Sequence, residues 1–301
     1  MLKQTIEAIK SLRIQGAQAV AEAAVVALRA VAQTSRAQTS VYFLRELKAA
    51  ASALTRARPT EPMMRNSLAY ILAALKSGAT LKELRATVSA RIVDVLAHFE
   101  SAQKLIVGTT LKKLRSGMII YTHCHSSTVS AVLLAAKRAG MRFEVHNTET
   151  RPLYQGRRTA RELAQAGIAV HHYVDSAMRL ALKKADIALL GADAITAEGK
   201  VINKIGSELA AIVAARYDVP LYVCADSWKF DPTTLAGAEE PIELRPGREI
   251  WPRSPKGVVL RNWAFEKIAP ELITAIISEL GVLRPAHFVS EVQHSYAWML
   301  G

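Results

Sequence analysis

The chain has 301 residues, half of them apolar, so it can bury a sizeable core and is too hydrophobic to be disordered. It carries 39 Lys and Arg against 26 Asp and Glu, a formal net charge of +13. That charge points to an anionic partner: nucleic acid, a membrane surface or a phosphorylated small molecule. The sequence shows neither an uncharged apolar stretch long enough to span a membrane nor a secretory signal, so we expect a soluble cytoplasmic protein.

Residues 1–116 are predicted to form helices. Apolar residues recur at helical spacing from Ile6 to Val31, from Ser40 to Thr55, from Met63 to Lys76 and from Leu81 to Leu111. This segment holds 18 basic and 7 acidic residues, a net charge of +11, whereas residues 117–301 hold 21 and 19. The basic excess therefore lies almost entirely in the helical segment.

From Gly117 onward, short apolar runs alternate with helical stretches. The runs cover residues 118–124, 143–146, 170–174, 187–190 and 221–224. Alternation of this kind predicts a parallel sheet covered by helices on both faces. We therefore expect an α/β fold, with a helical N-terminal domain at residues 1–116 and a Rossmann-like domain with a mostly parallel sheet at residues 117–301.

Ligands of such sheets bind beyond the carboxyl ends of the strands, which singles out Cys124 after the first strand and Asp193 after the fourth. Ser126, Ser127 and Thr128 follow the cysteine and open a helix, whose N-terminus favours an anion and lowers the pKa of a thiol. The alternatives are that Cys124 is a small buried hydrophobe and that Asp193 is a turn or cap residue.

Asn203 and Lys204 are predicted to open another helix, where they could hold a phosphate. Alternatively, the asparagine caps the helix and the lysine is solvated.

Metals and nucleotide cofactors are not expected. His123 and His125 flank Cys124, but side chains alternate along a strand, which would place both histidines opposite the thiol. The sequence has no Gly-x-Gly-x-x-Gly and no P-loop motif, so neither a dinucleotide nor a P-loop nucleotide site is supported. Only 6% of residues are aromatic and no recognition motif accompanies the basic charge, which disfavours a nucleic-acid partner.

Several strings, taken in order, resemble the superfamily of initiation factor 2B subunits and sugar-phosphate isomerases. They are Ile9-Lys-Ser-Leu-Arg-Ile-Gln-Gly-Ala17, Arg58-Pro-Thr60, Thr122-His-Cys-His-Ser126, Thr148-Glu-Thr-Arg-Pro-x-x-Gln-Gly156, Gly191-Ala-Asp-Ala-Ile195, Val201-Ile-Asn-Lys-Ile-Gly206, Trp228-Lys-Phe230 and Asn262-Trp-Ala-Phe-Glu266. Each string alone is weak, but as a set they are specific and cover nearly the whole chain.

Among the branches of this superfamily, the chain is most similar to archaeal-type ribose-1,5-bisphosphate isomerase. The regulatory subunits usually lack the cysteine and have Glu at the position of Asp193. Methylthioribose-1-phosphate isomerases have Asn and Arg where His125 and Ala194 stand. The resemblance implies conversion of ribose 1,5-bisphosphate to ribulose 1,5-bisphosphate without metal or nicotinamide. The alternatives are a non-catalytic initiation factor 2B-like subunit and an isomerase of a related monophosphate such as methylthioribose 1-phosphate.

The resemblance also implies roles for individual residues. Cys124 would accept the proton from the sugar C2, and Asp193 would act as acid or base for ring opening and at the sugar oxygens. Eight further residues match positions that contact the substrate, chiefly its phosphates: Gly16, Ala17, Arg58, Ser126, Ser127, Asn203, Lys204 and Lys229. The expected assembly is a homo-oligomer, either a dimer or a trimer of dimers, with AMP as a possible activator.

One position departs from the pattern. The isomerases of the superfamily typically carry Arg-Gly-Ala-Gly where this chain has Gln15-Gly16-Ala17-Gln18. The change removes a phosphate-binding arginine, and one charge-assisted contact is worth about 1.5–3 kcal/mol. Arg13 or another basic residue would have to replace it.

Overall fold

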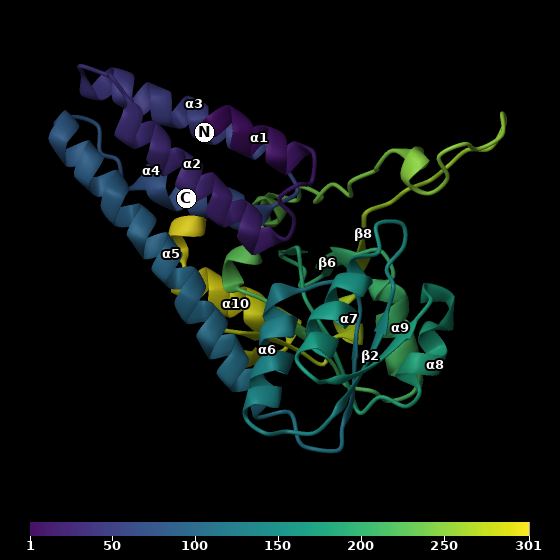
Figure 1. Ribbon diagram of the computed structural model, residues 1–301. Coiled ribbons are helices and arrows are strands. Elements are labelled where there is room, and N and C mark those ends of the chain that lie inside the picture. The colour runs from purple at the N-terminus through teal and green to yellow at the C-terminus, as the bar shows by residue number, and fades with distance from the viewer. Residues whose placement is uncertain (301) are drawn as a thin grey trace.

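The computed structural model describes residues 1–300 and has the predicted α/β fold. Its ten α-helices are α1 (Leu2–Lys10), α2 (Ala17–Thr34), α3 (Ser40–Ala57), α4 (Pro62–Ala73), α5 (Leu81–Leu111), α6 (Ser127–Arg138), α7 (Gln155–Gln165), α8 (Met178–Leu182), α9 (Ser207–Arg216) and α10 (Pro285–Ser295). Figure 1 shows α1–α5 gathered in one body and the sheet with α6–α10 in another, with the long α5 running along both.

Helix α2 lies at the centre of the first body, where it packs against α1, α3, α4 and α5. Its small residues, such as Ala21 and Ala24, are fully buried and allow this close packing. The apolar periodicity predicts one continuous helical stretch from Ile6 to Val31, but the structure breaks it. Leu12 and Gly16 have φ of 57° and 91°, which no helix accommodates, so α2 begins anew at Ala17.

Helix α5 joins the two bodies. It opens with a capping box in which Thr80 and Glu83 satisfy each other's backbone N–H groups. Its buried residues recur at helical spacing, with Val88 and Ile92 in the core of the helical body and Ile106 in the core beneath α6. No helix within residues 1–300 is long and apolar enough to cross a bilayer.

The main sheet has seven strands in the order β10-β9-β7-β4-β1-β2-β3, and all of its pairings except β9–β10 are parallel. Helices α6 and α7 cover one face, and α8 and α9 cover the other (Figure 1). The chain runs outward from β1 through β2 to β3, then returns to place β4 on the other side of β1. The carboxyl ends of β1 and β4 therefore flank the crevice where such sheets bind ligands. The strands are β1 (Ile119–Thr122), β2 (Glu144–Thr148), β3 (Ala169–Tyr173), β4 (Ile187–Leu190), β7 (Leu221–Cys224), β9 (Ala275–Ser278) and β10 (Gly281–Leu283).

A second sheet, which the alternation pattern does not predict, stands beside the crevice. It is antiparallel and consists of β5 (Ala194–Ile195), β6 (Val201–Lys204) and β8 (Phe265–Ile268). Asn203 and Lys204 lie on β6 and not at the start of a helix, so that expectation was wrong. The helix begins three residues later, at Ser207, after its N-cap Gly206, which adopts a left-handed conformation with φ of 99°.

Candidate active site

A two-lobed cavity opens at the carboxyl ends of β1 and β4, between the sheet and the start of α2. The lobes enclose about 620 and 560 Å³, counting their openings to solvent. Lobe A is lined by Leu12, Arg58, Cys124, Gln155, Lys204 and Phe265. Lobe B is lined by Ala17, Gln18, Ala19, Ser126, Ser127, Gly191, Ala192 and Lys229. The waist between them consists of the residues shared by both: Gln15, Gly16, His125, Arg158, Asp193 and Asn203.

Cys124 lies just beyond β1 in a strained backbone conformation. Its φ of 65° is unusual for a residue with a side chain, and its N–H donates to Thr150 Oγ1 at 3.0 Å. Thr150 has a similar φ of 62°, and its own N–H donates to the Asp175 carboxylate. Strain held by a hydrogen-bond network is typical of functional positions. Cys124 as a whole is 8% exposed, and it lines lobe A.

Burial raises the pKa of the Cys124 thiol to about 11, although the Lys204 ammonium and the His125 N–H act in the opposite direction. The sequence-based expectation that this pKa is lowered was therefore wrong. Desolvation of the buried sulfur outweighs the attraction of Lys204 and the hydrogen bond from the His125 backbone. The resting group is a thiol, which must lose its proton before it can act as a base.

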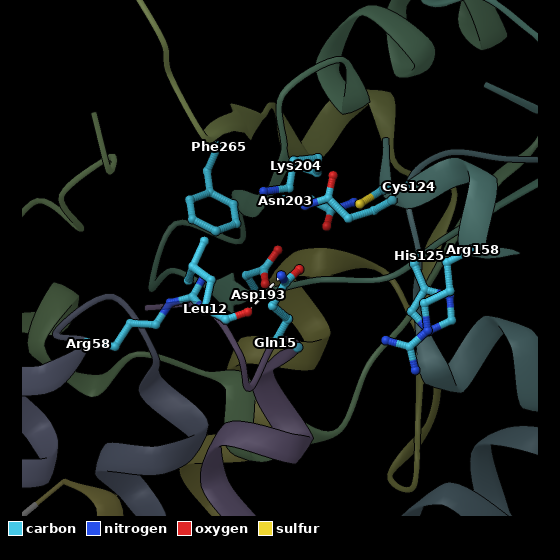
Figure 2. Close-up of a pocket in the computed structure, with 12 residues that line it drawn as sticks. Leu12, Gln15, Arg58, Cys124, His125, Arg158, Asp193, Asn203, Lys204 and Phe265 are labelled. Atoms are coloured by element: carbon cyan, nitrogen blue, oxygen red, sulfur yellow. Dashed lines mark hydrogen bonds between the residues drawn. The ribbon is translucent and has the colours of Figure 1, made fainter. Parts of the chain in front are cut away.

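The two histidines beside Cys124 have different surroundings. His123 is buried, and its Nε2–H donates to Ile205 O at 2.8 Å while Nδ1 accepts from the Thr148 hydroxyl. It thus ties β1 to β2 and to the loop before α9. His125 instead lines the cavity waist, as Figure 2 shows. The strand alternation expected for residues 123–125 does not apply, because β1 ends at Thr122. Within residues 1–300, no group of potential metal ligands includes these three residues.

Asp193 follows β4 and lies in the waist, where it reaches both lobes. Its N–H donates to Ile202 O at 2.8 Å, so β6 fixes its backbone. Lys229 enters lobe B from the short 3₁₀ helix after β7. It is 7% exposed, and its Nζ donates to Ala192 O at 2.7 Å, which anchors a buried cation beside the waist. A buried lysine that faces a cavity is suited to hold an anion.

Arg58 and Lys204 supply the positive charge of lobe A. The guanidinium Nε of Arg58 lies 3.1 Å from Glu61 Oε1, and Nη2 lies 3.9 Å from Glu243 Oε2. Glu61 is fully buried, and desolvation raises the pKa of its carboxyl to about 7 against the attraction of Arg58. Lys204 Nζ lies 4.3 Å from the ring centroid of Phe265, its register partner on β8. The aromatic face holds the ammonium near Cys124.

Two helix N-termini point into lobe B. Helix α2 begins at Ala17 after Gly16, and the residues of its first turn line the lobe. Helix α6 begins at Ser127, with the Ser126 hydroxyl accepting from Val129 N–H at 3.3 Å. The N–H groups of a helix's first turn have no partner within the helix and carry partial positive charge. Lobe B therefore combines two anion-attracting helix ends with the Lys229 ammonium.

All ten residues singled out in the sequence line this cavity. Cys124, Arg58 and Lys204 lie in lobe A; Ala17, Ser126, Ser127 and Lys229 lie in lobe B; Gly16, Asp193 and Asn203 lie in the waist. Arg13, the suggested replacement for the missing arginine, lines neither lobe, and its Nε donates to Ser11 Oγ.

Sequence reasoning missed four contributors: Glu61, His125, Arg158 and Phe265. His125 was considered as a metal ligand and as a mark of the branch, not as a residue of the cavity, and Arg158 lies two residues beyond the end of the string that closes at Gly156.

Comparisons with known proteins identify the family of the chain. The model of the Initiation factor 2 subunit family matches residues 13–285. "Ribose 1,5-bisphosphate isomerase" of Thermococcus kodakarensis is 36% identical over 98% of this chain and 94% of its own. "Methylthioribose-1-phosphate isomerase" of Pelotomaculum thermopropionicum is 35% identical, over 93% and 82%.

Among solved structures, "translation initiation factor eIF-2B" of Pyrococcus horikoshii superimposes with a TM-score of 0.84. It is 27% identical, and the match covers 96% of this chain and 98% of the other. The family model spans most of the chain, and relatives above 30% identity span nearly all of it. The chain therefore belongs to the Initiation factor 2 subunit family.

Proposed function

We propose that this protein is an aldose–ketose isomerase that converts ribose 1,5-bisphosphate to ribulose 1,5-bisphosphate. The observation that carries the proposal is the two-lobed cavity, with cations in both lobes and Asp193 in the waist between them. A pentose with a phosphate at each end needs two anion sites separated by the reacting carbons. The name and similarity of the Thermococcus kodakarensis relative support the same activity.

In the proposed reaction, Cys124 and Asp193 divide the proton transfers. The Cys124 thiolate removes the proton from C2, and the C–H electrons form a double bond to C1 as the bond from C1 to the ring oxygen breaks. Asp193 in its acid form gives its proton to that ring oxygen. The protonated Cys124 then returns a proton to C1, while the Asp193 carboxylate takes the proton of the C2 hydroxyl as the carbonyl forms. Substrate and product are isomers, so both groups end in their starting state.

The proposed phosphate contacts follow the charges of the two lobes. Arg58 and Lys204 would hold one phosphate in lobe A. Lys229, Ser126, Ser127 and the backbone N–H groups at Gly16 and Ala17 would hold the other in lobe B. Asn203, whose Nδ2 donates to Ser207 Oγ at 3.0 Å, would direct its amide oxygen to the sugar hydroxyls. Two phosphates bring nearly four negative charges, which explains the need for several cations and backbone donors.

A substrate panel tests the assignment. Purified protein is incubated with ribose 1,5-bisphosphate, ribose 5-phosphate, ribose 1-phosphate and methylthioribose 1-phosphate, with and without AMP, and the ketose products are followed by nuclear magnetic resonance. We expect turnover of the bisphosphate at a kcat/KM at least 100-fold above that of any monophosphate. Turnover of methylthioribose 1-phosphate alone would assign the chain to the second isomerase activity found among its relatives.

A non-catalytic role is the other candidate, because the chain superimposes on a structure entitled translation initiation factor eIF-2B. A pull-down with initiation factor 2 at physiological salt separates the two proposals, and binding without any turnover would favour the regulatory role.

We also propose that the protein forms a homo-oligomer, a dimer or a trimer of dimers, in the cytoplasm. We further propose that AMP activates the enzyme and that the boundary between the helical domain and the Rossmann-like domain lies near residue 116. Sedimentation with and without AMP and limited proteolysis test these points.

A further inference from the structure

Lobe B has less positive charge than a phosphate group needs if Lys229 acts alone. A phosphate monoester carries between one and a half and two negative charges near neutral pH. Gln15 is neutral, and its side-chain amide donates to Leu12 O at 2.8 Å, so that amide is already engaged. The Lys229 ammonium donates one of its three N–H groups to Ala192 O. Of the residues that line lobe B, the other one with a permanent positive charge is Arg158.

The start of α7 fixes where Arg158 stands. The backbone of Gly156 lies so close to β2 that a Cβ there would come within 1.8 Å of Thr148 O, and Asn147 Nδ2 donates to Gly156 O at 2.7 Å. One residue beyond Arg158, the Thr159 hydroxyl donates to Cys124 O at 2.9 Å. The first turn of α7 is therefore locked to the ends of β1 and β2, and the Cα of Arg158 is held beside the cavity waist.

His125 completes this arrangement. The Thr159 hydroxyl has one proton, which goes to Cys124 O, so His125 Nδ1 donates to Thr159 Oγ1 at 3.0 Å. This hydrogen bond fixes the orientation of the His125 imidazole in the waist. Burial lowers the pKa of the His125 ring, and the nearby Arg158 charge lowers it further against the opposing effect of Glu162. Figure 2 shows the two side chains next to each other, on the opposite side of the cavity from Arg58 and with Asp193 between.

Arg158 is also free of competing partners. Among residues 1–300, no carboxylate lies within ion-pair distance of its guanidinium. By contrast, Arg58 is held by Glu61, and the neighbouring Arg157 pairs with Glu149 at 2.9 Å and stacks 3.8 Å over Tyr154. An unpaired arginine whose helix is rigidly placed at a cavity is ready to form a bidentate contact with a phosphate.

We propose that Arg158 is the second cation of a phosphate subsite in lobe B, with His125 as its positioning residue and Lys229 as its partner. This inference rests on the proposed function, because it adds a specificity-determining residue for a substrate with two phosphates. It also assigns to Arg158 the charge that residue 15 does not provide. Arg158 then favours the binding of bisphosphates over monophosphates, whereas an arginine that contacts only solvent would not affect substrate specificity.

The test compares Arg158→Gln with Arg158→Lys and with Arg157→Gln as the matched control. Binding of ribulose 1,5-bisphosphate, ribose 1-phosphate and ribose 5-phosphate is measured by calorimetry at fixed ionic strength. Loss of a charge-assisted hydrogen bond corresponds to a roughly 10- to 100-fold weaker affinity. We expect that loss in Arg158→Gln for the bisphosphate and for the one monophosphate whose phosphate fills lobe B. The other monophosphate should bind as in the wild type, Arg158→Lys should recover part of the affinity, and Arg157→Gln should change nothing.

A double-mutant cycle measures whether two residues act on the same phosphate, which a purely structural role of Arg158 would not affect. Arg158 and Lys229 should show coupled losses because they hold one phosphate, whereas Arg158 and Arg58 should show additive losses because they hold different ones. Bisphosphate affinity in Arg158→Gln within twofold of the wild type would overturn the inference, as would equal losses for both monophosphates. If the wild type binds no sugar phosphate, the proposed function fails. Titration with inorganic phosphate then still tests the subsite, since Arg158→Gln should lose one of two bound phosphates.

Discussion

The acid–base behaviour of Cys124 gives the sharpest prediction about the chemistry. Burial raises the pKa of its thiol to about 11, so at pH 7 only about one molecule in 10⁴ carries the thiolate that the reaction needs. Each pH unit below this pKa changes the thiolate fraction tenfold, which corresponds to about 1.36 kcal/mol. We therefore expect the fraction of Cys124 in the thiolate form to rise by about 100-fold between pH 7 and pH 9.

Alkylation measures the same group without the substrate. The rate at which iodoacetamide modifies Cys124, followed by mass spectrometry, should rise about tenfold per pH unit across the same range. Cys224 is fully buried, and desolvation raises the pKa of its thiol to about 12, so Cys224→Ser should leave the profile unchanged. Lys204→Gln removes a cation that lowers the Cys124 pKa, so alkylation should be slower at every pH. If the alkylation rate of the wild type stopped rising below pH 9, the reasoning would be refuted, because the helix dipole and Lys204 would then outweigh burial.

Three further predictions concern the elements that position the cavity. Gly156→Ala should lower the free energy of unfolding by about 3 kcal/mol, measured by urea denaturation, because its Cβ would meet Thr148 O at 1.8 Å. Gly108→Ala, in α5, is the control for a glycine in open space without a positive φ, and equal losses in both variants would contradict this explanation. Asn66→Leu should lower the free energy of unfolding by about 2–4 kcal/mol, because Asn66 Nδ2 donates at 2.8 Å to both Trp228 O and Phe230 O, which flank Lys229. A change below about 1 kcal/mol would show that water replaces the amide. Glu61→Gln should raise the free energy of unfolding by about 3 kcal/mol at pH 8 and leave it unchanged at pH 4.5. Burial raises this carboxyl's pKa, so its stabilising proton is present at low pH and lost as pH rises through about 7; the same gain at both pH values would exclude the titration.

The sequence predicts the elements of this fold where periodicity is strong. The five apolar runs from Met118 to Cys224 correspond to β1, β2, β3, β4 and β7, and the helical stretches from Ser40 onward are confirmed as α3, α4 and α5. The loop from Ser11 to Gly16 was missed because the apolar stripe continues through it, and only the backbone shows the turn at Leu12 and Gly16. Strand β6 was missed because Val201–Lys204 is short and only two residues separate it from the helix α9.

The cavity was predictable in part. The rule that ligands bind at strand ends singles out Cys124 and Asp193, which reach the same cavity from different strands. Glu61 and Arg158 escaped because nothing in their local sequence marks them. The significance of Glu61 depends on complete burial beside Arg58, and that of Arg158 depends on a helix start locked against two strands. The pKa of Cys124 was mispredicted for a related reason, because the depth of a side chain is a property of the fold and not of its neighbours in the chain.

In the proposed reaction, Cys124 and Asp193 move protons on a ribose bisphosphate. The most direct measurement follows ribose 1,5-bisphosphate by carbon and phosphorus nuclear magnetic resonance with the wild type, Cys124→Ser, Asp193→Asn and the control Cys224→Ser. We predict that the wild type and the control form ribulose 1,5-bisphosphate, whereas the two site variants fold normally and bind the substrate but are about 10²–10⁴-fold slower, because each loses its group for acid–base catalysis. Turnover by either site variant at a rate near that of the wild type, or no ribulose 1,5-bisphosphate from the wild type, would contradict the account.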